Sequence, residues 1–337
     1  MPIKITDGKD NLGFRTITNT LPDSCVSICL ASVLALQPAI AEEGGSGHYM
    51  PGSMSSFIDG IPGDPVFVVR GQVVTYDGTV AINRSIPIAG QAVANASAES
   101  VAVALTLLWA PEWDLGDKWS YAMTATIPWV DIKVSGDVMS AGGGPTLRIE
   151  DEAKAIGDIV LIPLMLKYKL SPDLSIDTRL AFYAPTGEYT VGALANTGKN
   201  FWTVEPTVGL MYFGLKNGRE ASIYFGADFN SKNDDTDYKS GTQVHIDATF
   251  AQHFPLWKGL AGAGLSAFYY KQVSGDSGSG ATFGDFKARA TGIGPALSFA
   301  RKAGDADVVA EFKWLKEFNN KNRLEGDTLW FKIVGKF

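Results

Sequence analysis

The chain has 337 residues, of which 45% are apolar, and a formal net charge of −7. An acidic protein is repelled by the phosphate backbone, so this charge argues against a nucleic-acid partner. A chain of this length forms either two globular domains or one large all-β unit.

The first predicted element is a secretory signal peptide over residues 1–41. Residues 25–36 are almost purely apolar and lead into an A-I-A sequence that ends at Ala41. An apolar core of about a dozen residues before a small-residue cleavage site is typical of such a leader and is too short to span a bilayer as a helix. We expect cleavage after Ala41. The long, nearly neutral stretch before the core leaves a downstream start, an extended leader or a buried helix as alternatives.

Both cysteines, Cys25 and Cys29, lie in this leader. The mature chain would therefore enter an oxidising compartment without any disulfide. We expect a large packed or hydrogen-bonded surface to hold it together instead.

Residues 42–64 form a Gly- and Pro-rich segment before the first predicted strand. The segment is too short to build a core of its own. We expect it either to pack inside the structure that follows, with Tyr49, Met50 and Phe57 as its apolar contacts, or to form a loose tail.

Residues 65–337 show apolar and polar side chains alternating with a period of two, which predicts β-strands. In residues 100–111, for example, Val103 and Leu105 fall on one face, while Ala104 and Thr106 fall on the other. We identify about twelve such segments, an even number that returns both ends to one side of a closed barrel. They start near Val66, Ser97, Lys118, Ile156, Leu174, Phe201, Glu220, Thr242, Gly259, Lys287, Asp305 and Asp327.

The connections between these segments alternate between short and long. Short ones read SPD, KNG and KAGD, whereas long ones cover residues 77–95, 136–155, 184–200 and 231–240. Tight turns at one end and long loops at the other are typical of bacterial outer-membrane barrels.

The polar face of the predicted strands carries Asp177, Arg179 and Asp247. The backbone of a lipid-exposed sheet must be fully paired, so the sheet must close into a barrel. The polar face must then line the lumen, because a basic residue at mid-membrane costs roughly 2–4 kcal/mol. Aromatic residues gather at segment ends, as in interfacial girdles, although packing in a soluble β-core would also gather them. The sequence thus predicts an all-β fold, a transmembrane antiparallel up-and-down β-barrel of about twelve strands in the outer membrane, with residues 42–64 as a candidate lumen plug.

The last strand ends on Phe337, which we place at the periplasmic interface. A terminal aromatic residue after alternating apolar positions resembles the signal that the barrel-assembly machinery reads. That machinery is therefore an expected partner, together with outer-membrane lipid.

The segment after the leader, with Gly44-Gly45-Ser46, Tyr49 and Pro51-Gly52, resembles the MetA-pathway phenol-degradation family of outer-membrane proteins. The likeness extends over the mature chain in length and pattern, but only residues 42–63 are specific. The resemblance implies a barrel channel of Gram-negative bacteria for hydrophobic molecules and supplies no catalytic residues.

Inward-facing apolar and polar residues define the predicted substrate path. Acidic and basic residues nearly balance on this face, so we expect them to pair across the lumen, whereas a selective ion pore would show one dominant sign. Two prolines inside strands, Pro206 and Pro295, predict kinks or bulges, since proline removes a ladder donor. The path residues are Arg70, Tyr76, Met165, Phe213, Phe268, Tyr270, His245 and Asp247, with Leu161 and Pro163 also read as inward.

An enzyme is the rival interpretation. His245 and Asp247 share one face and could form a catalytic pair, but this spacing is common on any strand. No two histidines have a third ligand at a recognisable interval, so we predict no metal and no cofactor. The acidic loop around Asp234, Asp235 and Asp237 could bind Ca²⁺, but a solvated loop is the better interpretation.

The sequence is therefore interpreted as a channel for passive uptake of small hydrophobic or aromatic compounds and not as an enzyme. The alternatives are a barrel enzyme of the lipid-hydrolase type and a structural barrel without a transport path.

Overall fold

The computed structural model describes residues 47–80, 85–88, 91–139, 146–281 and 287–337. The expected signal peptide over residues 1–41, with its cleavage site and both cysteines, lies outside these residues, as do residues 42–46 of the segment that follows it.

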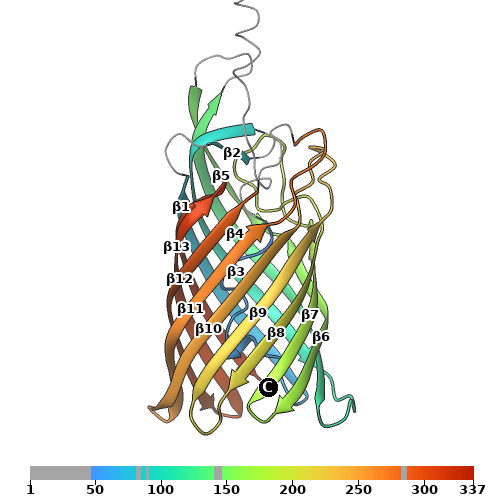
Figure 1. Cartoon of the computed structure of the whole chain (residues 1–337), viewed down its shortest axis with the longest axis vertical. Helices are drawn as coiled ribbons and strands as arrows, with labels where there is room; N and C mark the ends of the chain where they lie inside the picture. Colours follow the sequence, from blue (N-terminus) through green and yellow to red (C-terminus); the bar gives the residue numbers. More distant parts are fainter. Residues whose placement is uncertain (1–46, 81–84, 89–90, 140–145, 282–286) are drawn as a thin grey trace, which may run out of the picture. The chain divides into compact units, whose positions relative to one another are not determined.

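Twelve strands of the described residues close into an antiparallel barrel (Figure 1). Each pairs with the next along the chain, and β1 closes the ring against β14 through Val68 opposite Lys336. The predicted fold class and strand number are thus confirmed. The ring consists of β1 (Val66–Thr79), β3 (Gln91–Ala110), β4 (Trp119–Met139), β6 (Ile159–Ser171), β7 (Leu174–Ala184), β8 (Thr203–Phe213), β9 (Arg219–Asn230), β10 (Gln243–Leu256), β11 (Gly259–Gln272), β12 (Arg289–Ala303), β13 (Ala306–Lys321) and β14 (Glu325–Lys336).

Two further strands lie outside the ring, where the sequence predicted only long connections. Strand β2 (Ser85–Ile88) pairs with β3, and β5 (Thr146–Ile156) pairs with β4. Strand β4 is 21 residues long, whereas about 9–11 residues span a bilayer. Its second half, from Trp129 onward, pairs with β5, which satisfies the backbone groups beyond the ring. The interpretation of residues 136–139 and 146–155 as a loop is therefore wrong.

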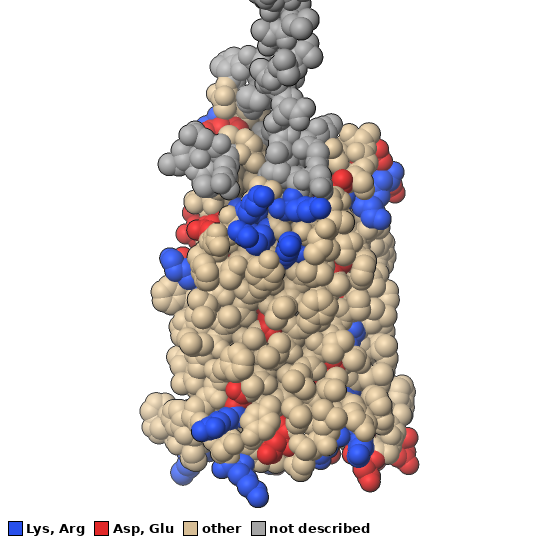
Figure 2. Space-filling view, viewed as in Figure 1, with Lys and Arg blue, Asp and Glu red and all other residues tan. Residues whose placement is uncertain are grey.

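The outer face of the wall is apolar, as predicted. On β3, Val103, Leu105 and Leu107 are 50%, 49% and 43% exposed, whereas the alternating Ala104 and Leu108 are buried. Figure 2 shows an almost uncharged band on one face, with Lys, Arg, Asp and Glu gathered above and below it. Such a band between charged ends is the surface expected of a wall that faces hydrocarbon.

Loop lengths sort by end (Figure 1). The short turns lie at the end where the chain finishes, and the long loops lie at the other, together with β2 and β5. One two-residue turn is Trp257-Lys258, in which both residues have positive φ, 46° and 59°. This geometry is that of a two-residue hairpin turn whose twist matches the flanking strands.

The sequence predicted kinks or bulges at Pro206 and Pro295, but the strand register shifts at another proline. The register runs unbroken past Pro206 and Pro295, which leave only gaps in the pairing with β9 and β13. It shifts instead between Leu161 and Leu164, around Pro163. The bulge changes which face each residue takes, so Leu161 and Pro163 are exposed on the outside and were wrongly read as inward.

In the part of the chain that the structure describes, helices play almost no part. The 3-10 turn η2 (Phe57–Asp59) lies before β1. None of the helices in the described part of the chain is long and apolar enough to cross a membrane.

Candidate functional site

Residues 47–64, called here the lumen segment, run through the inside of the barrel. Its backbone amides donate to wall carboxylates: Gly52 to Asp247 at 2.8 Å and Phe57 to Glu220 at 2.7 Å. On the opposite wall, Trp330 Nε1 donates to the carbonyl of Pro51 at 2.8 Å. The described part of the predicted plug thus lies in the lumen and not in a loose tail.

A charged network fixes the centre of the lumen segment. Lys332 Nζ lies 2.9 Å from Asp59 Oδ1, and Arg70 Nη1 lies 3.1 Å from the same oxygen. Lys313 Nζ pairs with Glu311 at 3.0 Å and donates to Ser55 at 2.8 Å. The opposite charges of the lumen therefore pair with one another, and the lumen segment supplies one of the central carboxylates.

The charges around Asp59 also set its protonation. Burial alone would raise the pKa of this carboxyl. The positive charges of Lys332 and Arg70 outweigh burial and hold the pKa well below its usual value of 3.8. Asp59 is thus an anion that the network keeps charged.

Aromatic side chains of the lumen segment stack on the wall. Tyr49 lies between the rings of His245, 3.9 Å away, and Tyr270, 5.8 Å away. Its hydroxyl donates to Asp247 at 2.8 Å. Phe57 meets Phe213 at 5.4 Å between ring centroids. Two of the expected contact residues, Tyr49 and Phe57, therefore do contact the barrel.

A cavity of about 300 Å³ lies between the lumen segment and the wall formed by β1, β3, β4 and β6. Small and apolar side chains line most of it, and Asp59, Arg70 and Arg179 line its charged side. Met50, the third expected contact residue, borders this cavity and a smaller one of about 130 Å³. Lining residues from β3, β4 and β6 include Ala102, Ala104, Leu108, Thr126, Ile162 and Met165.

The predicted path residues divide into four groups. Arg70 and Met165 line the cavity of about 300 Å³, and Tyr76 lines the cavity of about 130 Å³. Phe213 lines a third cavity of about 470 Å³ beside the short turns. The others pack around Tyr49 and line none of these cavities: Phe268 and Tyr270 in an apolar cluster, His245 and Asp247 in a polar one.

Sequence reasoning did not select the small residues of β3 and β4. The alternation predicted that Ala104 and Thr106 share one face of a strand, but neither was predicted to be a path residue. The informative signal was the small size of the inward residues of β3 and β4, because small side chains leave the space that a solute needs.

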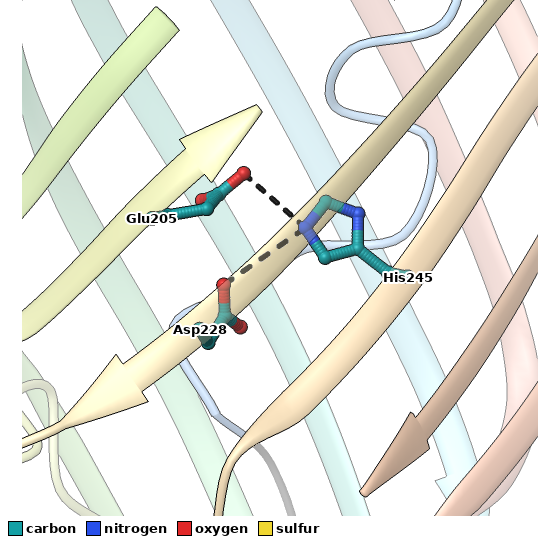
Figure 3. A group of neighbouring side chains, drawn as sticks. All are labelled: Glu205, Asp228 and His245. Carbon is teal, nitrogen blue, oxygen red and sulfur yellow. Dashed lines mark ion pairs between the residues drawn. The ribbon is translucent and has the colours of Figure 1, made fainter. Parts of the chain in front are cut away.

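Three side chains on neighbouring strands converge near the long-loop end (Figure 3). His245 Nε2 lies 3.2 Å from Glu205 Oε1 and 3.9 Å from Asp228 Oδ1. Its Nδ1 lies 3.2 Å from Asp247 Oδ2. The spacing of His245 and Asp247 in the sequence was noted, but no interval along the chain could reveal Glu205 and Asp228, because they come from two other strands.

The acidic loop after β9 is paired internally. Lys232 Nζ lies 2.7 Å from Asp237 and 3.4 Å from Asp234. The amide of Ser279 also donates to Asp237, at 2.9 Å. Lys232 and Ser279 together hold the pKa of the Asp237 carboxyl below its usual range. These contacts account for the loop as a set of surface ion pairs.

The chain end belongs to the barrel closure. Phe337 exchanges two backbone hydrogen bonds with Phe67, at 2.9 and 3.3 Å, and its residue is 72% exposed. The final residue thus extends the pairing of β14 with β1, at the end that carries the short turns.

Comparison with known proteins agrees with this architecture. A family model described as "Putative MetA-pathway of phenol degradation" matches residues 83–333. The match does not include residues 42–63, the segment that carried the resemblance in the sequence. The chain matches none of the curated proteins.

Among solved structures, the COG4313 outer membrane channel from Pseudomonas putida F1 is 18% identical, with a TM-score of 0.59 over 86% of this chain and 100% of that chain. The β domain of the Bordetella autotransporter BrkA is 10% identical, with a TM-score of 0.44 over 81% and 99%. The monoaromatic hydrocarbon channel TodX, as a deletion mutant, is 10% identical, with a TM-score of 0.41 over 89% and 96%. At 18% identity, the likeness to the COG4313 channel shows a shared barrel fold.

Proposed function

This chain belongs to the MetA-pathway phenol-degradation family, and from that premise we propose that it is a channel for passive uptake of small hydrophobic compounds, aromatic ones among them. The barrel lies in the outer membrane.

The observation that carries the proposal is the cavity of about 300 Å³ beside the docked lumen segment. Ligand pockets typically measure about 300–1,000 Å³ and combine apolar walls with a few polar groups. Ala102, Ala104 and Leu108 supply the apolar wall, and Arg70 and Arg179 supply the polar side. A single aromatic ring with one polar substituent suits such a lining.

We also propose that the barrel is not an enzyme. A serine hydrolase needs its histidine Nε2 to accept the proton of a nucleophilic hydroxyl. In this lumen His245 Nε2 faces Glu205 and Asp228, and its ring is covered by Tyr49. The arrangement supports binding and packing more than acyl transfer.

Uptake into liposomes that contain the purified protein tests the channel. Ala104→Phe places a ring in the cavity, since Ala104 lines it and is 8% exposed. The matched control is Leu105→Phe, one residue along β3, whose side chain is 49% exposed toward lipid. We expect phenol uptake to fall at least severalfold in Ala104→Phe and to remain unchanged in Leu105→Phe.

Two outcomes contradict the proposal. Wild-type vesicles that take up phenol no faster than empty vesicles would remove the channel itself. Uptake by folded Ala104→Phe at the wild-type rate would remove this cavity from the path.

A further inference from the structure

Glu205, Asp228 and His245 meet inside the wall, on the adjacent strands β8, β9 and β10 (Figure 3). One ligand atom of each lies within 4.8 Å of the others. All three residues are at most 1% exposed. The group therefore combines one imidazole nitrogen and two carboxylate oxygens, enclosed by protein, around a common point.

Gly226 makes this convergence possible. It lies opposite His245 in the β9–β10 register and opposite Thr207 in the β8–β9 register. A Cβ at position 226 would lie 2.2 Å from His245 Nε2. Because glycine has no side chain, the imidazole lies across the strand and reaches toward Glu205 on its far side.

The imidazole is held by a hydrogen bond on its Nδ1 side and faces two carboxylates on its Nε2 side. His245 Nδ1 bonds to Asp247 at 3.2 Å, which fixes the ring. His245 Nε2 makes no hydrogen bond, although it is buried and has Glu205 at 3.2 Å and Asp228 at 3.9 Å. Nε2 is thus buried beside two carboxylates without the linear geometry of a hydrogen bond, which leaves its lone pair available to a shared ligand.

Two of the three separations lie at or near those of a coordination shell, and the third, between the Glu205 and Asp228 oxygens, is within 4.8 Å. Zn²⁺ binds nitrogen and oxygen at about 2.0–2.2 Å, which places adjacent ligand atoms about 3–3.6 Å apart. The Glu205–His245 separation of 3.2 Å lies in this range, and a shift of a few tenths of an ångström brings in Asp228 from 3.9 Å. Asp247 on Nδ1 supplies the outer carboxylate that orients metal-binding histidines.

We propose that Glu205, Asp228 and His245 bind one divalent transition-metal ion of the Zn²⁺ class. An imidazole with two carboxylates suits Zn²⁺, Co²⁺ or Mn²⁺, whereas Ca²⁺ takes six to eight oxygen ligands. The ion would fix His245 as the neutral ring with its proton on Nδ1. That tautomer donates to Asp247, which accepts from Tyr49 of the lumen segment at 2.8 Å, so the metal would brace the plug.

Cobalt binding to the untagged full chain, refolded in detergent, tests the site. Co²⁺ bound by protein ligands in a distorted site absorbs visible light more strongly than hydrated Co²⁺, and Zn²⁺ should displace it. We expect one equivalent per chain, since among the described residues this is the one group of such ligands. Glu205→Gln and Asp228→Asn should each weaken binding at least tenfold, and His245→Gln should abolish it.

The matched control is His253→Gln. His253 is also buried, and its Nε2 pairs with one carboxylate, Glu220, at 2.7 Å. This variant should bind Co²⁺ like the wild type. Heat-dependent mobility on gels establishes that each variant is folded, so a loss of binding in folded Glu205→Gln and Asp228→Asn supports the site.

The proposal is overturned by a wild-type protein whose spectrum stays that of hydrated Co²⁺. It is equally overturned if folded Glu205→Gln and Asp228→Asn bind with wild-type affinity, or if Ca²⁺ displaces Co²⁺ as well as Zn²⁺ does. If the spectrum stays that of hydrated Co²⁺, Glu205, Asp228 and Asp247 form an ion-pair network around the protonated imidazole of His245.

Discussion

Single charged residues determine how firmly the lumen segment is held. Asp59 accepts from Lys332 at 2.9 and 3.0 Å and pairs with Arg70 at 3.1 Å, and its side chain has no exposed area. Breaking a buried ion pair by removing one partner costs more than the pair contributes, because a charge remains buried without its counter-ion.

Asp59→Asn should therefore destabilise the protein by about 3 kcal/mol. The free energy of unfolding, from urea titration in lipid vesicles, measures this effect. The control is Glu152→Gln on β5, whose pairs with Lys133 and Lys154 are exposed and should give no measurable change. Equal stability of Asp59→Asn and wild type would show that the network does not hold the segment.

The same residue predicts a pH dependence. The folded-state pKa of Asp59 is lowered below 3.8, so its stabilisation is fully present above pH 3.8 and is lost as the pH falls below that value. The difference in unfolding free energy between wild type and Asp59→Asn should therefore stay constant from neutral pH to about pH 5 and shrink in stronger acid. A difference that already shrinks near pH 6 would assign the effect to another group.

At the scale of elements, lipid contact explains what the sequence could predict. Strands β7 and β11 begin at Leu174 and Gly259, the predicted positions, because each has one face against hydrocarbon and must alternate. Strand β5 was missed because its residues pair beyond the ring and carry exposed charges, so Glu150 and Lys154 read as loop residues. Alternation of apolar and polar residues indicates that one face of a strand meets lipid. A strand without such a face, like β5, is not detected by this pattern.

The turn between β10 and β11 predicts a gain in stability. Lys258 has a φ of 59°, a conformation that costs an L-residue roughly 1–2 kcal/mol and costs glycine little. Lys258→Gly should raise the free energy of unfolding by about 1 kcal/mol, while Lys258→Ala, which removes the same side chain, should not. Urea titration of the two variants compares them, and an equal effect of both would attribute the change to the lysine side chain.

At the scale of the whole molecule, ring closure decides which inward residues meet. The sequence assigned Asp247 to the lumen but could not show that it would bind Tyr49, or that Glu205 would face His245. Those contacts depend on the order and stagger of the strands and on the course of the lumen segment. The inward face was therefore predictable, whereas the division between packed network and open cavity was not.

Two routes for a solute differ in what the lumen segment does. The solute passes beside the docked segment, or it passes only after the segment has left the lumen. The described residues contain no cysteine, so a new pair can lock the segment to the wall. Ser55 on the segment and Thr249 on β10 are both at most 1% exposed, and their hydroxyls lie 3.3 Å apart. A disulfide needs its sulfur atoms about 2 Å apart, so a small shift allows Ser55→Cys and Thr249→Cys to join.

Because the cavity of about 300 Å³ exists while the segment is docked, oxidised Ser55→Cys/Thr249→Cys should take up phenol at the rate of its reduced form. Liposome uptake before and after addition of a reductant compares the two states in one sample, and Thr249→Cys alone controls for the reductant. Uptake that is lost on oxidation and restored on reduction would show that the segment must move. In that case Tyr49, stacked on His245 and bonded to Asp247, would act as part of a gate and not as one wall of a fixed path.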